Sequence, residues 1–147
     1  MTTLYQQFNA ALQRRLEANL VIAGELVATE VRRNIQKSPR GGKTYVKTNP
    51  NRVHKASAAG ESPATDLGFL VRSIQTEPDL DNLRIRVVSL FTIAPYARRL
   101  EFGDMARGLH PRPFMFKSLA AKKQKAEDLM KKALNAAIRD MQGADIQ

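Results

Sequence analysis

Residues 4–35 read LYQQFNAALQRRLEANLVIAGELVATEVRRNI, and this stretch decides the fold. Leucine or phenylalanine recurs at every fourth position up to Leu20, and the same step continues from Ala23 to Ile35, with charged residues between. This pattern predicts one long amphipathic helix. The segment SPRGG at 38–42 follows directly and predicts the end of the helix, because proline and glycine do not continue it.

The apolar stripe of this helix is expected to wind around it. A strict step of four residues drifts by about 40° per repeat, because the α-helix has about 3.6 residues per turn. The core of one domain rarely covers a stripe that changes face. We therefore expect part of the stripe to contact a neighbouring subunit.

Three further features are predicted between the basic region and residue 91. A short helix over 67–74 is expected, capped by Thr65 or Asp66. A turn is expected at 78–82, where Pro, Asp and Asn gather. The clearest strand follows at 83–91, where apolar residues alternate with arginines, as on a sheet with one covered face.

A second long helix is predicted over 114–141, with Pro113 in its first turn and lysines along one side. The predicted fold class is α+β. A long N-terminal helix and a C-terminal helix pack on a small antiparallel sheet, with a long basic loop. We expect a single domain over 1–142 and a frayed tail at 143–147.

Charge is the strongest signal in the composition. The 147 residues carry a formal net charge of +10 and no cysteine. A basic balance of this size predicts attraction to polyanions or to an acidic protein surface. The N-terminal residues lack the pattern of a signal peptide, and no apolar run approaches the ~20 residues that span a bilayer. We therefore expect synthesis in the cytoplasm and no membrane partner.

The basic residues concentrate in 31–60, which contains no carboxylate. Glycine, proline and asparagine fill the gaps, so the sequence predicts a long, mobile basic loop or loose hairpin over 38–63. Contact with DNA phosphates and contact with an acidic protein both remain open, although a single aromatic residue argues against base stacking. The residues predicted to contact a neighbour or DNA are Arg40, Lys43, Tyr45, Lys47, Arg52, His54 and Lys55.

Catalysis is not expected. His54 and His110 would suit an acid–base pair, but one lies in the basic loop and the other precedes a proline. The spacings of zinc, calcium and phosphate-loop motifs do not occur; RGGKT at 40–44 lacks the required glycine spacing. The sequence therefore predicts no enzyme activity, no metal site and no cofactor.

The segment PYARRLEFGDMARGLHPRPFMF at 95–116 places apolar residues among arginines. A helical turn that ends at Gly103 is expected, with Glu101 paired to a nearby arginine (Arg98, Arg99 or Arg107). One interpretation is a corner that packs Phe102 and Phe114 into the core, and another is an edge that faces a neighbour. The residues predicted to form a subunit interface are Tyr96, Leu100, Glu101, Phe102, Arg112 and Phe114.

Several motifs occur in an order that resembles a known family. They are ASAAGESPA at 56–64, DLGFL at 66–70, YA with LEFG between 96 and 103, and RPF at 112–114. Their order is similar to that in the small head–tail connector, tail-completion or neck proteins of tailed bacteriophages, from about Leu4 to Leu134. The residues between the last two motifs run slightly longer than the family pattern, and no second proline follows Phe114.

The resemblance implies a structural virion protein and not an enzyme. It implies an α+β subunit that forms a homo-oligomeric ring around the DNA channel, with a hexamer slightly favoured over a dodecamer. The implied partners are phage head-completion or adaptor proteins, tail-terminator or tail-tube proteins, and nonspecific contact with packaged double-stranded DNA. The alternative is a small basic protein that binds DNA without sequence preference.

Overall fold

A computed structural model of the chain describes residues 3–144, and its first element is helix α1 (Leu4–Gln36). The Thr3 side chain accepts a hydrogen bond from the N–H of Gln6, whose own side chain accepts one from the N–H of Thr3. This reciprocal cap satisfies donors that the first helical turn leaves free. The helix ends at Gln36, two residues before the SPRGG segment, so the predicted helix and its end are confirmed.

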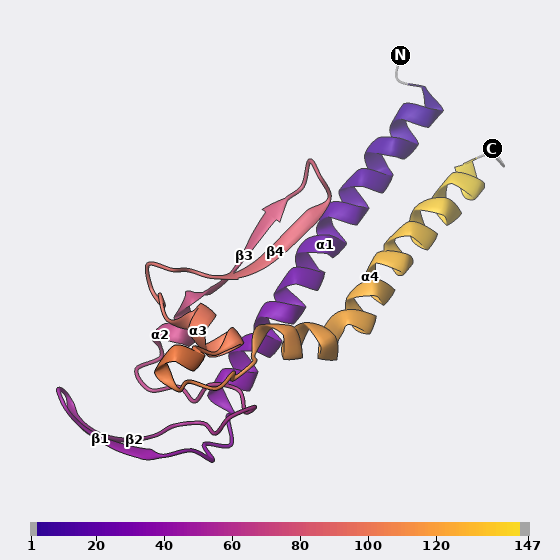
Figure 1. Cartoon of the computed structure of the whole chain (residues 1–147). Helices are drawn as coiled ribbons and strands as arrows, with labels where there is room; N and C mark the ends of the chain where they lie inside the picture. The colour runs from indigo at the N-terminus through magenta and orange to yellow at the C-terminus, as the bar shows by residue number, and fades with distance from the viewer. Residues whose placement is uncertain (1–2, 145–147) are drawn as a thin grey trace.

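Helix α4 (Met115–Ala144) runs antiparallel to α1 and lies beside it (Figure 1). Three contacts along the pair show this register: an ion pair between Arg15 and Asp140, one between Glu30 and Lys122, and a 2.8 Å hydrogen bond between Asn34 Nδ2 and Ser118 Oγ. The second long helix is therefore confirmed. It includes residues 143 and 144 of the predicted frayed tail, and the rest of that tail lies outside the described residues.

Two antiparallel hairpins replace the single sheet that the sequence predicted. Strands β1 (Thr44–Thr48) and β2 (Asn51–Lys55) form one, and β3 (Ile74–Asp79) and β4 (Arg84–Ser89) form the other. The predicted strand at 83–91 is β4, shorter at both ends. Its partner β3 overlaps the predicted turn, because proline and acidic residues hide a strand that pairs on one edge only. The α+β class itself is confirmed.

Three short elements complete the described chain: α2 (Phe69–Ser73), α3 (Ala97–Phe102) and the 3₁₀ turn η1 (Met105–Arg107). The predicted cap of α2 was wrong. Gly68 holds the N-cap position with φ of 78°, a left-handed conformation that favours glycine. The predicted cap residue Asp66 instead accepts hydrogen bonds from Lys47 and Arg52.

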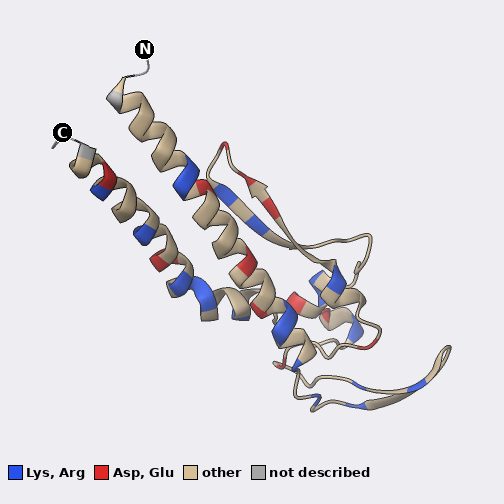
Figure 2. Cartoon of the chain, turned by 180° about the vertical axis from the view of Figure 1, so that it is seen from behind, with Lys and Arg blue, Asp and Glu red and all other residues tan. Residues whose placement is uncertain are grey.

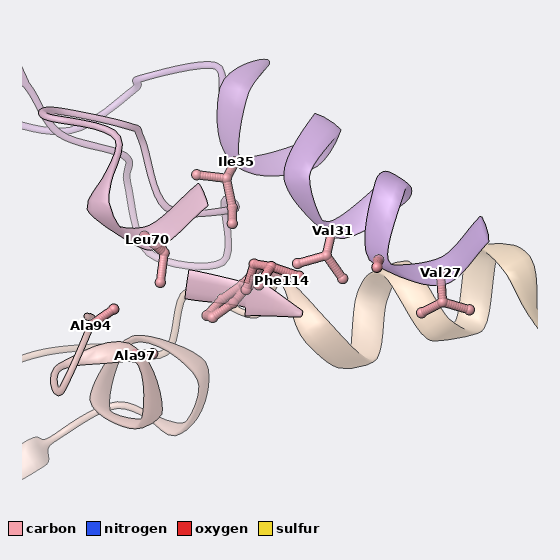
Figure 3. Close-up of a cluster of buried hydrophobic side chains, with 9 residues drawn as sticks. Val27, Val31, Ile35, Leu70, Ala94, Ala97 and Phe114 are labelled. Atoms are coloured by element: carbon pink, nitrogen blue, oxygen red, sulfur yellow. The ribbon is translucent and has the colours of Figure 1, made fainter. Parts of the chain in front are cut away.

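The core lies where the C-terminal half of α1 meets α2, α3 and the start of α4. Figure 3 shows the Phe114 ring between Val31 and Ile35 of α1 on one side and Leu70 of α2 on another. Phe114 is 1% exposed and is the largest fully buried side chain. No helix in the described part of the chain has the length and hydropathy needed to cross a membrane.

Candidate functional site

Glu101 is the buried centre of the 95–116 segment. Its carboxylate accepts hydrogen bonds from three consecutive backbone N–H groups, those of Phe114 at 2.8 Å, Met115 at 2.9 Å and Phe116 at 3.0 Å. These donors belong to the start of α4, where a helix leaves its first N–H groups without partners and favours negative charge. Glu101 therefore caps α4 from a different helix.

The predicted ion pair of Glu101 with an arginine was wrong. Arg99 and Arg107 approach Asp104 instead, at 3.8 and 3.1 Å. Gly103 ends α3 with φ of 80°, and the chain then turns back through a bridge between Asp104 and Leu109. This return brings the residues before α4 over Glu101, which the sequence alone did not reveal.

The structure divides the six predicted interface residues into two groups. Glu101 and Phe114 are buried inside the chain, and their contact with a neighbouring subunit stays a prediction. Leu100 packs against the core, and Arg112 is half-buried and donates its backbone N–H to the Leu100 carbonyl at 2.7 Å. These four residues build the corner rather than its surface.

Tyr96 and Phe102 remain on the surface. The exposed ring of Phe102 meets that of Phe116 edge to face, with centroids 6.0 Å apart. Phe91 is also exposed, and it lines the same shallow surface pocket as Phe102 and Phe116. Three phenylalanines thus form an aromatic patch at the corner where α3, α4 and the chain after β4 meet.

The β1–β2 hairpin, here called the hairpin arm (residues 44–55), projects from the end of the molecule (Figure 1). The sequence left a loop and a loose hairpin open for this region, and the structure has a paired hairpin with register Tyr45 to His54 and Lys47 to Arg52. Because side chains alternate along a strand, these four residues share one face, the inner face. That this region is mobile before assembly stays a prediction.

Asp66 fixes the inner face of the hairpin arm to the body of the chain. Its carboxylate accepts a hydrogen bond from Lys47 Nζ at 2.6 Å and two from the Arg52 guanidinium at 2.7 Å each, and His54 Nδ1 lies 3.7 Å away. The paired bonds from arginine constrain orientation as well as distance. The arm therefore leaves the body at a defined angle.

The electrostatics of this cluster follow from the same contacts. Hydrogen bonds from Arg52 and then Lys47 hold the pKa of Asp66 far below its ordinary value. The Asp66 carboxylate in turn raises the pKa of Arg52. Partial burial lowers the pKa of His54, so its ring is neutral at pH 7 and forms no charged pair there.

Three of the seven predicted contact residues of the basic region are thus held within the chain, namely Lys47, Arg52 and His54. Arg40, Lys43, Tyr45 and Lys55 are exposed. The cationic surface that the arm presents is smaller than the sequence suggested, since one carboxylate outside the 31–60 region neutralises part of it. Figure 2 shows the remaining basic residues spread along α4 and over the arm.

The opposite, outer face of the hairpin arm is apolar at its centre. Val46 and Val53 are cross-strand partners and are 74% and 69% exposed. Thr44 with Lys55 and Thr48 with Asn51 flank them on the same face. These two largely exposed valines lie side by side, which makes the outer face of the arm a candidate contact surface.

An apolar groove lies on the body of the molecule, between α1, β4 and α4. It has a volume of about 700 Å³ and is lined by residues of all three elements. Its lining includes Val27, Val31, Ile85, Met115, Leu119 and Met130. Phe116 belongs both to this groove and to the aromatic patch, so the two form one continuous apolar surface. The winding stripe of α1 was the sequence signal for such an uncovered region.

Metal and acid–base chemistry find little support in the described chain. His54 lies on Asp66, whereas His110 is exposed in the turn before α4. Within residues 3–144, no group of three or more His, Asp or Glu side chains is placed to hold a metal ion. The two apolar surfaces described above, the outer face of the arm and the groove, form the candidate functional site.

Comparison with known proteins found no matching family model, no matching curated protein and no matching solved structure.

Replacing Asp66 with asparagine is expected to loosen the hairpin arm without unfolding the core. Asparagine keeps the size but loses the charge that strengthens the hydrogen bonds from Lys47 and Arg52. Amide hydrogen exchange in β1 and β2 should become roughly tenfold faster. Asp81→Asn, in the turn of the other hairpin, is the matched control; unchanged exchange in the arm of Asp66→Asn would contradict the anchoring role.

The same anchor predicts the pH dependence of arm protection. The folded pKa of Asp66 lies below its ordinary value of 3.8. Its contribution is therefore present in full above about pH 4 and is lost as the pH falls further toward the folded pKa. Exchange in the arm, corrected for the intrinsic rate, should accelerate below about pH 4. A smaller acceleration is expected as the pH falls below about 6.5, because the lowered pKa of His54 means that the unfolded arm binds that proton more readily.

Proposed function

We propose that the chain is a structural subunit of the neck of a tailed bacteriophage. In this proposal, copies of the chain assemble into a ring around the DNA channel and join the head to the tail. The order of motifs from residue 56 to residue 114 supports this assignment by resemblance. The two-helix body with a projecting hairpin suits a subunit that touches its neighbours.

The observation that carries the proposal is the outer face of the hairpin arm. An isolated two-stranded hairpin is marginally stable, and its apolar residues are usually covered. Here Val46 and Val53 point away from the anchoring carboxylate of Asp66 and are left exposed. The chain thus presents an apolar surface to solvent, which favours a role in assembly over one in catalysis.

The charge fits a ring that surrounds DNA. Lysines along α4 and the exposed cations near the arm supply a basic surface that attracts phosphates without reading bases (Figure 2). On this proposal the two ends of the ring meet head-completion or adaptor proteins and tail-terminator or tail-tube proteins. The hexamer stays slightly favoured over the dodecamer.

A small DNA-binding protein without sequence preference is the second candidate, and the net charge of +10 favours it. Its signature is different. Such a protein binds random duplex DNA as a monomer, with an affinity that falls steeply with salt. The exposed valine pair has no role in that function, because valine does not bind phosphate.

The proposal is tested on purified particles of the phage that encodes the chain. Quantitative mass spectrometry should find the chain at a fixed copy number per particle, and antibody labelling should place it at the junction of head and tail. Absence of the chain from purified particles, together with tight DNA binding by the free monomer, would establish the second candidate instead.

A further inference from the structure

We propose that the outer face of the hairpin arm of one copy docks into the apolar groove of an adjacent copy. The arm supplies Val46 and Val53, and the groove is lined by apolar residues of α1, β4 and α4. The inference rests on the proposed function, since it assumes that copies of this chain associate. It names which two surfaces meet.

The arm does not cover its own groove. Its inner face is bound to Asp66, so the valines of the outer face point away from the body. Figures 1 and 2, taken from opposite sides, both show the arm extending from the end of the molecule, away from the region where β4 faces α1. The arm of the same chain therefore does not fill the groove.

The groove matches the arm in size and chemistry. A volume of about 700 Å³ is large enough for two valine side chains and the strands that carry them. Its lining includes Ile85 from β4 and Leu119 and Met130 from α4. Methionine and leucine adapt readily to an inserted β-branched side chain. Both surfaces lose solvent exposure when they meet, which is the driving force for docking.

The charges at the two surfaces are complementary. Lys55 lies on the outer face of the arm, two residues from Val53, and is exposed. Glu127 and Lys131 both line the groove, and Glu127 Oε1 lies 3.9 Å from Lys123 Nζ. A carboxylate held this loosely is free to pair with an incoming lysine. A nucleic acid fits neither an apolar groove nor a valine pair, so protein is the occupant that the chemistry selects.

A second copy is favoured over an unrelated protein because one chain carries both halves of the contact. The two halves are different surfaces at separate places, so the contact is heterologous rather than two-fold symmetric. Heterologous contacts of this kind generate closed rings when the rotation per subunit closes, and open filaments when it does not. The docking therefore supplies a physical route to the ring.

The absence of cysteine from the sequence makes a direct test simple. Val46→Cys and Leu119→Cys are prepared as separate full-length proteins, mixed and oxidised. A disulfide-linked heterodimer is expected from this mixture, because the two positions meet between copies. Tyr45→Cys, on the inner face of the same strand, is the matched control and should link to Leu119→Cys at least tenfold more slowly.

A second pair of variants tests the same contact without crosslinking. Val46→Asp with Val53→Asp should abolish association while the far-ultraviolet circular dichroism stays unchanged, since both side chains are exposed. Lys55→Glu should weaken association, and Glu127→Lys in the same chain should restore it. Failure of the reversed pair to restore association would count against the predicted charge contact.

The outcomes separate this inference from the proposed function. Rings that survive the Val46→Asp, Val53→Asp double substitution would overturn the docking and leave the neck assignment standing. Equal crosslinking of the Val46→Cys and Tyr45→Cys proteins would also overturn the docking. A wild-type chain that stays monomeric and is missing from phage particles would overturn both.

Discussion

Glu101→Ala is expected to lower the free energy of unfolding by about 3–5 kcal/mol, because a buried carboxylate that serves three backbone N–H groups disappears. The substitution leaves the N–H groups of Phe114, Met115 and Phe116 without their acceptor. Each unsatisfied buried donor costs about 1–3 kcal/mol, and water entering the vacated space offsets part of the sum. A loss of this size is a large share of the stability of a typical domain, about 5–15 kcal/mol.

Chemical denaturation of the purified protein measures this effect. Glu101→Gln should lie between the wild type and Glu101→Ala, since the amide keeps one acceptor oxygen and loses the charge. Glu77→Ala, which removes an exposed glutamate from β3, should change stability by less than about 0.5 kcal/mol. A Glu101→Ala protein as stable as the Glu77→Ala protein would show that the carboxylate does not hold the start of α4.

Phe114→Ala is the second large effect, with an expected loss of about 3–5 kcal/mol. The ring is 1% exposed and lies between α1, α2 and α3, so its removal leaves a cavity that rigid helices do not close. Phe91→Ala is the matched control, because that ring is 76% exposed and its loss should change stability little. Thermal unfolding followed by circular dichroism distinguishes the two.

Glu101 and Phe114 should also interact energetically. The Glu101 carboxylate accepts from the backbone N–H of Phe114, so each residue helps to place the other. The double substitution is therefore expected to cost less than the sum of the single ones, by about 0.5–3 kcal/mol. Strict additivity would mean that the cap and the core at this corner are independent.

The two long helices could be predicted from the sequence because their signal is local and repeated. A four-residue step over 4–35 and an apolar side over 114–141 each contain many turns of consistent pattern. The strand β4 was found for the same reason, since three apolar residues alternate with arginines. Its partner β3 was missed, because Pro78 and the charges around it conceal a strand defined mainly by its neighbour.

The contacts that shape the candidate site depend on distances along the chain that no local pattern encodes. Asp66 was read as a helix cap, yet it binds the arm 14 and 19 residues earlier, at Arg52 and Lys47. Glu101 was read as a partner for a nearby arginine, yet it binds backbone N–H groups that carry no side-chain signature. In both cases the sequence points to the acidic residue, but the contact predicted for it differs from the one in the structure.

The outer face of the arm was also overlooked for a physical reason. The basic residues of 31–60 dominate the composition, and the valines between them look like ordinary strand residues. Only the pairing of β1 with β2 shows that Val46 and Val53 lie together on the side opposite Lys47 and Arg52. The exposed valines of the outer face, as well as the charge of this region, are therefore candidates for contact with a partner.

The measurement that tests the central claim most directly is the mass of the assembly of the purified full-length chain by native mass spectrometry. The account predicts a single discrete ring, a hexamer slightly favoured over a dodecamer, that dissociates when Val46 and Val53 are both changed to aspartate. A chain that remains monomeric at every concentration and shifts duplex DNA with a steep dependence on salt would contradict it.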